Sequence, residues 1–316
     1  MARDGVRIHL DTDIGGDPDD ACALAMLLGW PGVEVTAVTT TIDRGGLRAG
    51  CAAHVLELAG RADVPVAAGA SVSLTTGLPA DPACEDERMW SRSVAARPSS
   101  AGEAFDLLDR SIAAGETIVA TGPYTNLALL EMARPGSIAR TPIVLMGGWV
   151  RPPAEGLPAW GPDMDWNVQW DTRSAEVVFA AASSLTLATL PATLRAHLRE
   201  ADVPRLRATG ALGELLARQS LARADEAGMR ELGRAHAALP DDLLNFHYDP
   251  VACAVAVGWP GAVVEEARLR AVLEDGVLRF QPDPAGRPTR VVVDLDGPAF
   301  SEAWLTAVET AQRRSP

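Results

Sequence analysis

The sequence is short of basic residues, because its 28 Lys and Arg stand against 42 Asp and Glu and give a formal net charge of -14. A nucleic-acid-binding surface has to be basic to meet the phosphate backbone. The charge balance therefore argues against nucleic acid as a partner. Long apolar runs are missing as well, since none approaches the ~20 residues of a membrane-spanning helix. We therefore expect no membrane partner.

Cysteine is scarce and carries no recognisable spacing. Cys22, Cys51, Cys84 and Cys253 are scattered and form neither a CxxC pair nor a zinc-ligand pattern. They are interpreted as buried or incidental thiols in a reducing compartment. The opening residues, MARDGVRIHLD, are charged and lead at once into a strand pattern, which predicts no N-terminal targeting signal. Both features favour a cytoplasmic location.

Several catalytic signatures are also absent. The sequence has no GxxxxGK(S/T) phosphate loop and no GxSxG nucleophile elbow, so nucleotide phosphate binding by a P-loop and serine nucleophile catalysis have no support. A DxD pair, Asp11 and Asp13, follows the first strand pattern, as in phosphatases of the haloacid dehalogenase type. Those enzymes carry Thr or Val two residues after the second Asp, where this chain has Gly15.

What the chain does have is a regular alternation of short β-branched runs and longer helical patterns. Strand patterns occupy 6–10, 33–41, 64–69, 117–122 and 141–150, and helical patterns occupy 19–30, 46–60, 103–115, 124–136 and 172–182. This alternation predicts parallel βαβ units. The expected fold class is α/β, with a mostly parallel, Rossmann-like central sheet flanked by helices on both faces. We expect one domain over residues 1–316.

The remaining segments are less regular. Residues 71–100 and 150–170 have loop composition, and loops at the carboxyl ends of parallel strands commonly carry the functional site. Residues 195–245 have a helical pattern. The last part of the chain predicts a strand hairpin over 267–280, then one more strand and a final helix.

The loop after the first strand reads DTDIGGDPDD and contains five aspartates, Asp11, Asp13, Asp17, Asp19 and Asp20. Carboxylates that converge in one loop repel each other unless some are protonated or a cation lies between them. Calcium and magnesium prefer carboxylate and carbonyl oxygens. The alternative is an acidic start to the following helix, favoured by the helix dipole, but this accounts for only one or two aspartates. A metal site is the favoured interpretation.

The same loop resembles the N-terminal motif of the inosine–uridine-preferring nucleoside hydrolase family. Further segments agree in order along the chain: VATGPYTNLALL with the family's TGPLTN segment, IVLMGGWV with its MGG strand, MDWNVQWDTRSAEVV with its EFN stretch, and FHYDPVACAVA with its HDP segment. The resemblance implies an α/β fold, a single calcium ion, and hydrolysis of the N-glycosidic bond of ribonucleosides to free base and ribose. It also implies a homodimer or homotetramer.

The resemblance assigns the metal ligands by position. Asp13, Asp20 and Asp249 are expected to bind Ca²⁺ through their carboxylates and Thr121 through its main-chain carbonyl. Asp13 is also expected to take the proton from the attacking water, whose pKa the metal lowers. Carboxylates around the ribose would stabilise the positive charge that develops as the C1′–N bond breaks.

Other positions are expected to hold the substrate. Asp19 and Asn167 match residues that bind the ribose hydroxyls, and Asp249 is expected to accept from the 3′-hydroxyl as well. Met146, in the MGG strand, is assigned to the substrate pocket. Asp11 is expected to support the loop and not to touch the substrate.

Four positions depart from the family pattern. Asp165 replaces a Glu that grips the 5′-hydroxyl, and the family's Asn upstream of EFN, which also binds that hydroxyl, has no clear match. Arg44 replaces a common Asn and is expected either to meet an anionic group or to face solvent. Tyr248 stands where many members have a histidine that protonates the leaving base, while His247 lies one place earlier.

These departures shape the expected base pocket. Tyr248 would stack on the base as in purine-preferring members, polarising it for departure after protonation by solvent. Adjacent side chains in an extended segment point to opposite sides, so His247 is expected to pack behind the site, although it is kept among the candidate substrate-binding residues. Of the tryptophans in or beside the two long loops, Trp90 or Trp160 is expected to face the base.

The functional hypothesis is therefore a calcium-dependent ribonucleoside hydrolase that leans towards purines. A second hypothesis is a hydrolase of a modified or atypical N-riboside, which Asp165, Arg44 and the missing Asn favour. A third is a calcium- and nucleoside-binding homologue without turnover, against which the retained Asp13 argues.

Overall fold

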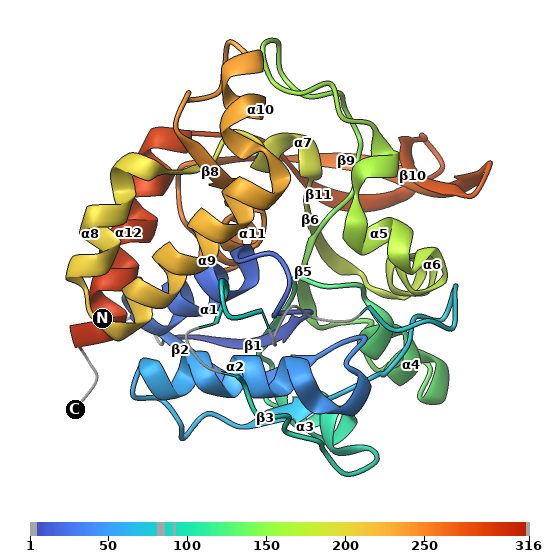
Figure 1. Cartoon of the computed structure of the whole chain (residues 1–316). Helices are drawn as coiled ribbons and strands as arrows, with labels where there is room; N and C mark the ends of the chain where they lie inside the picture. The colour runs from blue at the N-terminus through green and yellow to red at the C-terminus, as the bar shows by residue number, and fades with distance from the viewer. Residues whose placement is uncertain (1–4, 81–85, 91–92, 314–316) are drawn as a thin grey trace.

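The computed structural model describes residues 5–80, 86–90 and 93–313, and within them nine strands form one central sheet (Figure 1). In spatial order these are β10 (Val277–Pro282), β9 (Ala262–Glu274), β11 (Arg287–Leu295), β6 (Ser184–Ala188), β5 (Pro142–Met146), β4 (Thr117–Ala120), β1 (Val6–Thr12), β2 (Val33–Thr40) and β3 (Val66–Ala68). Strand β9 is antiparallel to β10 and β11, and the other pairings are parallel. The predicted mostly parallel sheet is confirmed.

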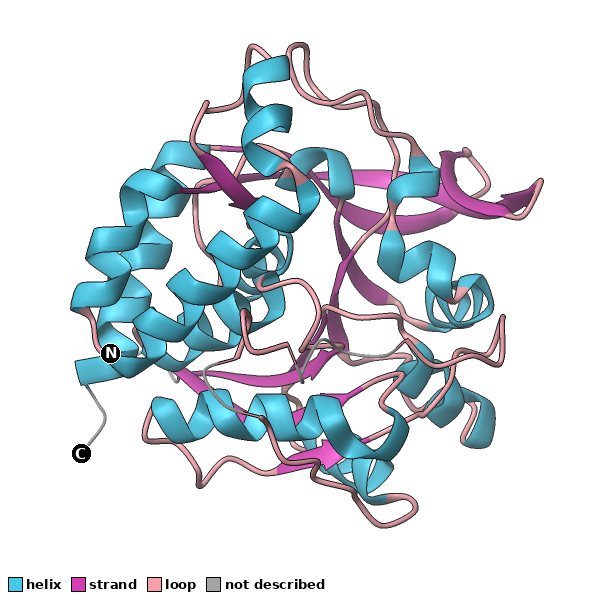
Figure 2. Ribbon diagram, in the orientation of Figure 1, coloured by secondary structure: helices cyan, strands magenta, loops and turns pink. Residues whose placement is uncertain are grey.

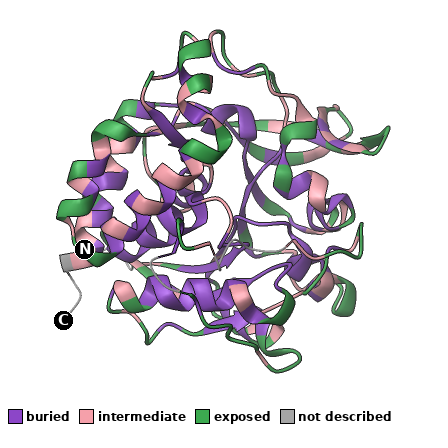
Figure 3. Ribbon diagram, viewed as in Figure 1, coloured by how far each residue is buried: buried purple, intermediate pink, exposed green. Residues whose placement is uncertain are grey.

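Helices cover both faces of this sheet (Figure 2). On one face lie α1 (Asp19–Gly29), α11 (Tyr248–Ala256) and α12 (Gly297–Arg313), and on the other α4 (Thr125–Ala133) and α6 (Thr172–Ala181). Because successive side chains of a strand point to opposite faces, Val144 and Met146 of β5 join the first core and Ile143 and Leu145 join the second. The central strands are buried on both faces (Figure 3), which explains why β5 is apolar at successive positions.

The other elements surround this frame. They are α2 (Leu47–Leu58), α3 (Glu103–Ala113), α5 (Trp166–Trp170), α7 (Leu190–Thr193), α8 (Val203–Ala208), α9 (Ala211–Ala227), α10 (Met229–Ala235) and three short 3₁₀ helices, η1 (Arg44–Gly46), η2 (Pro162–Met164) and η3 (Glu200–Asp202). A separate antiparallel pair joins β7 (His197–Arg199) to β8 (Leu243–Phe246). None of the helices in the described ranges combines the length and apolar character needed to cross a bilayer.

Three strands depart from the sequence predictions. Strand β6 was not expected, and β7 and β8 fall within or at the edge of a region predicted to be helical. Five-residue β6 and three-residue β7 are too short to show a clear period, and pairing with neighbours distant in sequence decides their conformation. The predicted C-terminal hairpin, strand and helix are confirmed as β9–β10, β11 and α12.

The cysteines only partly match their interpretation. Cys22 and Cys253 are buried free thiols, as expected. Cys51 is buried but does not carry a free thiol, so the expectation is wrong there. Cys84 lies outside the described residues.

The sheet order places one crevice at its centre. From β1 the chain builds β2 and β3 to one side, then crosses back and continues with β4, β5 and β6 on the other side. In such sheets the carboxyl ends of the two strands that flank the reversal form a natural binding crevice. Asp13 follows β1 and Thr121 follows β4, so both lie at this point.

Candidate active site

A pocket of about 690 Å³ opens at the carboxyl ends of the central strands. Ten of the twelve residues assigned to the site from the sequence line it: Asp13, Asp19, Asp20, Thr121, Met146, Trp160, Asp165, Asn167, Tyr248 and Asp249. The structure therefore gathers residues that are separated by more than 230 positions in the chain.

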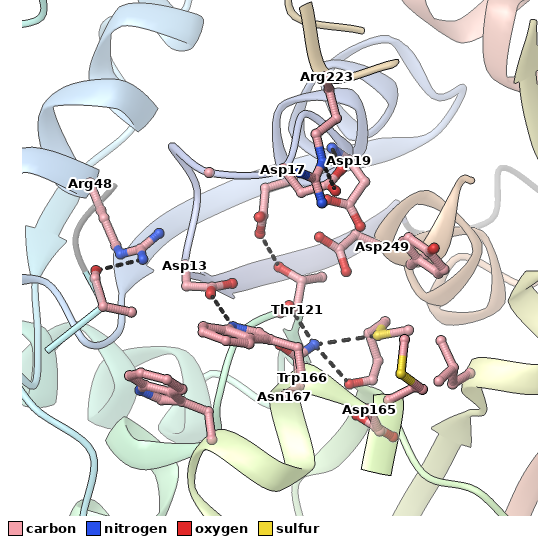
Figure 4. Close-up of a pocket in the computed structure, with 18 of the residues that line it drawn as sticks. Asp13, Asp17, Asp19, Arg48, Thr121, Asp165, Trp166, Asn167, Arg223 and Asp249 are labelled. Atoms are coloured by element: carbon pink, nitrogen blue, oxygen red, sulfur yellow. Dashed lines mark hydrogen bonds and ion pairs between the residues drawn. The ribbon is translucent and has the colours of Figure 1, made fainter. Parts of the chain in front are cut away.

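Three carboxylates meet in this pocket, and two of them, Asp19 and Asp249, are labelled in Figure 4. Asp19 and Asp20 occupy the first turn of α1, and Asp249 occupies the first turn of α11. One oxygen of each lies within 4.8 Å of the others. Two of the predicted metal ligands, Asp20 and Asp249, belong to this group, together with Asp19, which was assigned to the ribose. Asp13 lies beside the group and not within it.

Neighbouring donors orient these carboxylates. The hydroxyls of Thr12 and Thr121 both donate to Oδ1 of Asp20, the second over 3.0 Å. Oδ2 of Asp13 accepts from Nε1 of Trp166 over 3.2 Å. A Cβ on Gly122 would lie 2.8 Å from Asp13, so glycine is needed there for the loops after β1 and β4 to approach each other.

The electrostatics of the group indicate a missing positive charge. Burial raises the pKa of Asp13, raises that of Asp20 to about 7, and raises those of Asp19 and Asp249 well above the ordinary value, with repulsion between the carboxylates adding to the effect. The charge of Arg48 acts to lower the pKa of Asp13 and Asp20, but none of the four forms an ion pair with a described Lys or Arg. Buried carboxylates without a partner are costly. A divalent cation with oxygen ligands fits this donor set.

The predicted carbonyl ligand is also held in place. Nδ2 of Asn167 donates to the main-chain oxygen of Thr121 over 2.7 Å and to that of Met146 over 3.2 Å. A carbonyl oxygen has two lone pairs, so the Thr121 oxygen keeps one for a second partner. Asn167 thus connects α5 to the ends of β4 and β5.

Asp165 lines the pocket from the start of α5. Its carboxylate accepts from the main-chain N–H of Gly148 over 2.5 Å and from that of Val168 over 3.2 Å. Burial raises its pKa to about 6. The side chain is therefore fixed by main-chain donors at the end of the pocket near β5.

Aromatic rings form the rest of the wall. The rings of Tyr248 and Trp160 each contact Phe246, with centroids 5.4 and 5.7 Å away. Across the pocket, Trp166 and Trp170 stack with centroids 4.4 Å apart. A flat, partly apolar ligand ring would find contacts on both sides.

The whole chain also resembles known proteins. Residues 8–302 match the family model described as inosine-uridine preferring nucleoside hydrolase. The chain belongs to this family. It is 35% identical over 220 residues to a pyrimidine-specific ribonucleoside hydrolase, RihA, of Salmonella agona, and the match covers 64% of this chain. The match spans 66% of that relative, just under two thirds of its length.

Solved structures of nucleoside hydrolases share the fold. The purine-preferring ribonucleoside hydrolase of Gardnerella vaginalis has a TM-score of 0.78 at 21% identity, over 97% of this chain and 99% of that one. A plant nucleoside hydrolase has a TM-score of 0.77 at 22% identity, over 96% and 98% of the two chains. These neighbours show that the nucleoside hydrolase fold extends over nearly the whole chain.

Two of the assigned residues lie away from the pocket of this nucleoside hydrolase homologue. His247 is buried between the rings of Phe300 and Trp304, at 5.6 and 4.4 Å, where burial lowers its pKa to about 3. It packs behind the site, and the structure does not support its place among the substrate-binding residues. Trp90 is buried beside His54, so of the two tryptophans expected to face the base only Trp160 lines the pocket.

Two further sequence expectations concern the N-terminal loops. Asp11 does not line the pocket, and its Oδ1 accepts from Thr39 over 2.5 Å and from Asn126 over 2.7 Å, as expected for a supporting residue. Arg44 is exposed and does not line the pocket either.

Several pocket residues were not foreseen from the sequence. They include Asp17, Arg48, Met164, Trp166, Trp170, Arg223 and Glu226. Asp17 accepts from Arg223 of α9 over 3.0 Å and from Asn245 of β8 over 2.5 Å, which ties the acidic loop to the other wall. The region that contains α9 shows only an ordinary helical pattern in the sequence.

Proposed function

We propose that this protein is a calcium-dependent hydrolase of the N-glycosidic bond of ribonucleosides, which it converts to free base and ribose. The observation that carries the proposal is the convergence of Asp19, Asp20 and Asp249 beside Asp13 in one buried pocket without a paired cation. Membership of the nucleoside hydrolase family and the curated relative's name support the same chemistry.

We assign the calcium ligands to Asp13, Asp20, Asp249 and the Thr121 carbonyl, with Asp19 close enough to join them. When bound, the ion supplies Lewis acidity that lowers the pKa of a water molecule. Asp13 would take the proton from the attacking water as the water oxygen bonds to C1′. The C1′–N bond breaks, its electron pair leaves with the base, and the base is protonated from solvent.

The sugar is held by the polar floor of the pocket. Asp19, Asn167 and Asp249 bind the ribose hydroxyls, and Asp165 receives the 5′-hydroxyl. Negative charge around the ring stabilises the cationic sugar of the transition state. A deoxyriboside would leave some of these buried polar groups without a partner and would react more slowly.

The base lies against the aromatic wall. We propose that Tyr248 stacks on it, with Trp160 beside it, and that this arrangement favours purines. The pyrimidine-specific name of the Salmonella relative favours the opposite preference. Comparing kcat/KM for inosine, adenosine, guanosine, uridine and cytidine decides between a purine and a pyrimidine preference.

We also propose that residues 1–316 form one domain and that the protein is located in the cytoplasm. We propose that it works as a homodimer or homotetramer, as the family resemblance implies. The sheet supports one domain, because it pairs strands from both ends of the chain. Light scattering of the purified protein measures the assembly.

The decisive experiment measures ribose release from those five nucleosides together with the calcium content of the purified protein. We expect about one calcium per chain and release of ribose from at least one nucleoside. Asp241→Asn serves as a control, because Asp241 is exposed and outside the pocket. A calcium-loaded protein that releases no ribose from any of them would contradict hydrolysis of ordinary nucleosides. Product analysis with a library of modified ribosides would then test the second hypothesis.

A further inference from the structure

Arg48 brings a buried positive charge to the pocket wall. It lies on α2, is 3% exposed and lines the pocket. Its Nη1 donates to the Ile14 carbonyl over 3.2 Å and its Nη2 to the Ala80 carbonyl over 2.8 Å. Its Nε is buried without a hydrogen-bond partner. A guanidinium has five N–H donors, so two carbonyls fix the group while leaving most of its donors unused.

Two carboxylates interact with this charge, but neither forms an ion pair with it. The Arg48 guanidinium acts to lower the pKa of Asp13 and Asp20 against the effect of burial, yet among the described residues Arg48 has no ion-pair partner, and Trp166 is the residue that donates to Oδ2 of Asp13. The other cation of the pocket, Arg223, is paired with Asp17 at 3.0 Å. A buried N–H donor without an acceptor, such as Nε of Arg48, is costly. An anionic oxygen in the pocket that accepts from Nε would remove this cost.

The position of Arg48 indicates which end of a riboside it meets. In Figure 4, Arg48 extends from α2 towards Asp13, and it lies well apart from Asp165 and Asp249. On the proposed function, Asp165 marks the 5′ end of the sugar and Asp249 its ring hydroxyls. A 5′-phosphate would therefore meet the Asp165 carboxylate, whereas an anionic substituent on the edge of the base that points away from Tyr248 would be directed towards Arg48.

We propose that the pocket selects N-ribosides whose base carries a negative charge, with Arg48 binding the anionic oxygen. This proposal rests on the proposed function and specifies its substrate class. Carboxylates and ionised ring oxygens accept short, charge-assisted hydrogen bonds from a guanidinium.

The test compares ribosides that differ in one anionic group. Xanthosine, whose base ionises near neutral pH, is paired with inosine, and orotidine, which carries a carboxylate, is paired with uridine. We expect the wild type to prefer the anionic member of at least one pair. In Arg48→Gln the ratio of the two kcat/KM values should fall at least tenfold. Arg44→Gln, at an exposed arginine outside the pocket, should leave the ratio unchanged.

Calorimetry with free bases measures the same preference without turnover. Orotate should bind the calcium-loaded wild type at least tenfold more tightly than uracil, and Arg48→Gln should remove the difference. Arg48→Lys keeps the positive charge but lacks the forked guanidinium, so it should retain part of the preference for orotate. This variant keeps the test decisive if Arg48→Gln fails to fold. Hydrolysis of inosine or uridine with no anionic preference would overturn this inference while the proposed function stands. Inosine 5′-monophosphate reacting faster than inosine would place the anion at the sugar and also overturn it.

Discussion

Nε1 of Trp166 lies 3.2 Å from Oδ2 of Asp13, so the first residue of α5 holds a carboxylate that lies 153 positions earlier in the chain. The Trp166 residue is 49% exposed, and its ring stacks on that of Trp170. A hydrogen bond to a carboxylate contributes about 1.5–3 kcal/mol. The contact selects one orientation of the carboxylate that we assign as the proton acceptor.

Trp166→Phe removes this donor and keeps a ring in the pocket. We expect kcat to fall about fivefold, with a smaller change in KM and little loss of thermal stability, because only the orientation of Asp13 is relaxed. Steady-state kinetics with the best nucleoside and a thermal melt measure the two effects. A kcat equal to that of the wild type would show that the contact does not matter for turnover.

Asn167→Ala leaves the Thr121 carbonyl without the donor that orients it. Residues that orient a metal ligand commonly affect metal affinity by about 10- to 100-fold. We expect calcium affinity to weaken by about tenfold, measured by titrating calcium into the metal-free protein. Unchanged affinity would mean that the Thr121 carbonyl does not depend on this contact.

Asp20→Asn should separate two effects of the acidic group, its destabilisation of the metal-free protein and its binding of calcium. Without calcium, the variant removes a buried, repelled charge, so we expect its melting temperature to rise above that of the wild type. With calcium, the wild type gains stability from binding and the variant gains less, so the order reverses. Activity should fall more than 100-fold.

Melts in excess chelator and in excess calcium, with Asp241→Asn as the matched surface control, measure this reversal. Chelator should also abolish activity in the wild type, and Asp13→Ala should abolish it in calcium. Full activity in excess chelator would contradict a metal role for these carboxylates.

Tyr248 offers a test of base stacking. Tyr248→Leu should lower kcat/KM for inosine about tenfold, whereas Tyr248→Phe keeps the ring and should stay within threefold of the wild type. If Phe and Leu are equally impaired, the hydroxyl matters and stacking does not explain the role of this residue.

His9 predicts a pH dependence of stability. It is buried in β1 with its ring nitrogens 2.9 Å from the hydroxyls of Ser111 and Thr39, and burial lowers its pKa from 6.5 to about 3. The unfolded chain therefore binds a proton below pH 6.5 that the folded protein does not bind. This contribution to stability is complete above pH 6.5 and is lost as the pH falls towards 3.

The expected loss at His9 is about 1.4 kcal/mol per pH unit below 6. Urea unfolding of the wild type and His9→Gln between pH 4.5 and 7.5 measures it, since other titrating groups are common to both. As the pH falls below 6, the free energy of unfolding of the wild type should drop more steeply than that of His9→Gln, by about 1.4 kcal/mol per pH unit. Parallel pH profiles would show that His9 is protonated in the folded state.

Much of the fold follows from local patterns. The run around Val35 and Val38 is apolar and β-branched, and the helix that begins at Asp19 shows its start in the acidic first turn. Strands β6 and β7 carry no such local signal and form because neighbours distant in the sequence offer free main-chain groups. Sequences of five residues (β6) and three residues (β7) are too short to predict how these strands pair.

For the site, the sequence by itself determined which carboxylates the chain places at its strand and helix ends, because the spacing from Asp13 to Asp20 and the Asp249 segment are local features. Only the tertiary structure decided that Asp19 joins Asp20 and Asp249 and that Arg48 and Trp166 enter the pocket. The physical reason is that burial and orientation depend on how β1, β4 and α11 meet, and distances across the sheet are not encoded within any single segment.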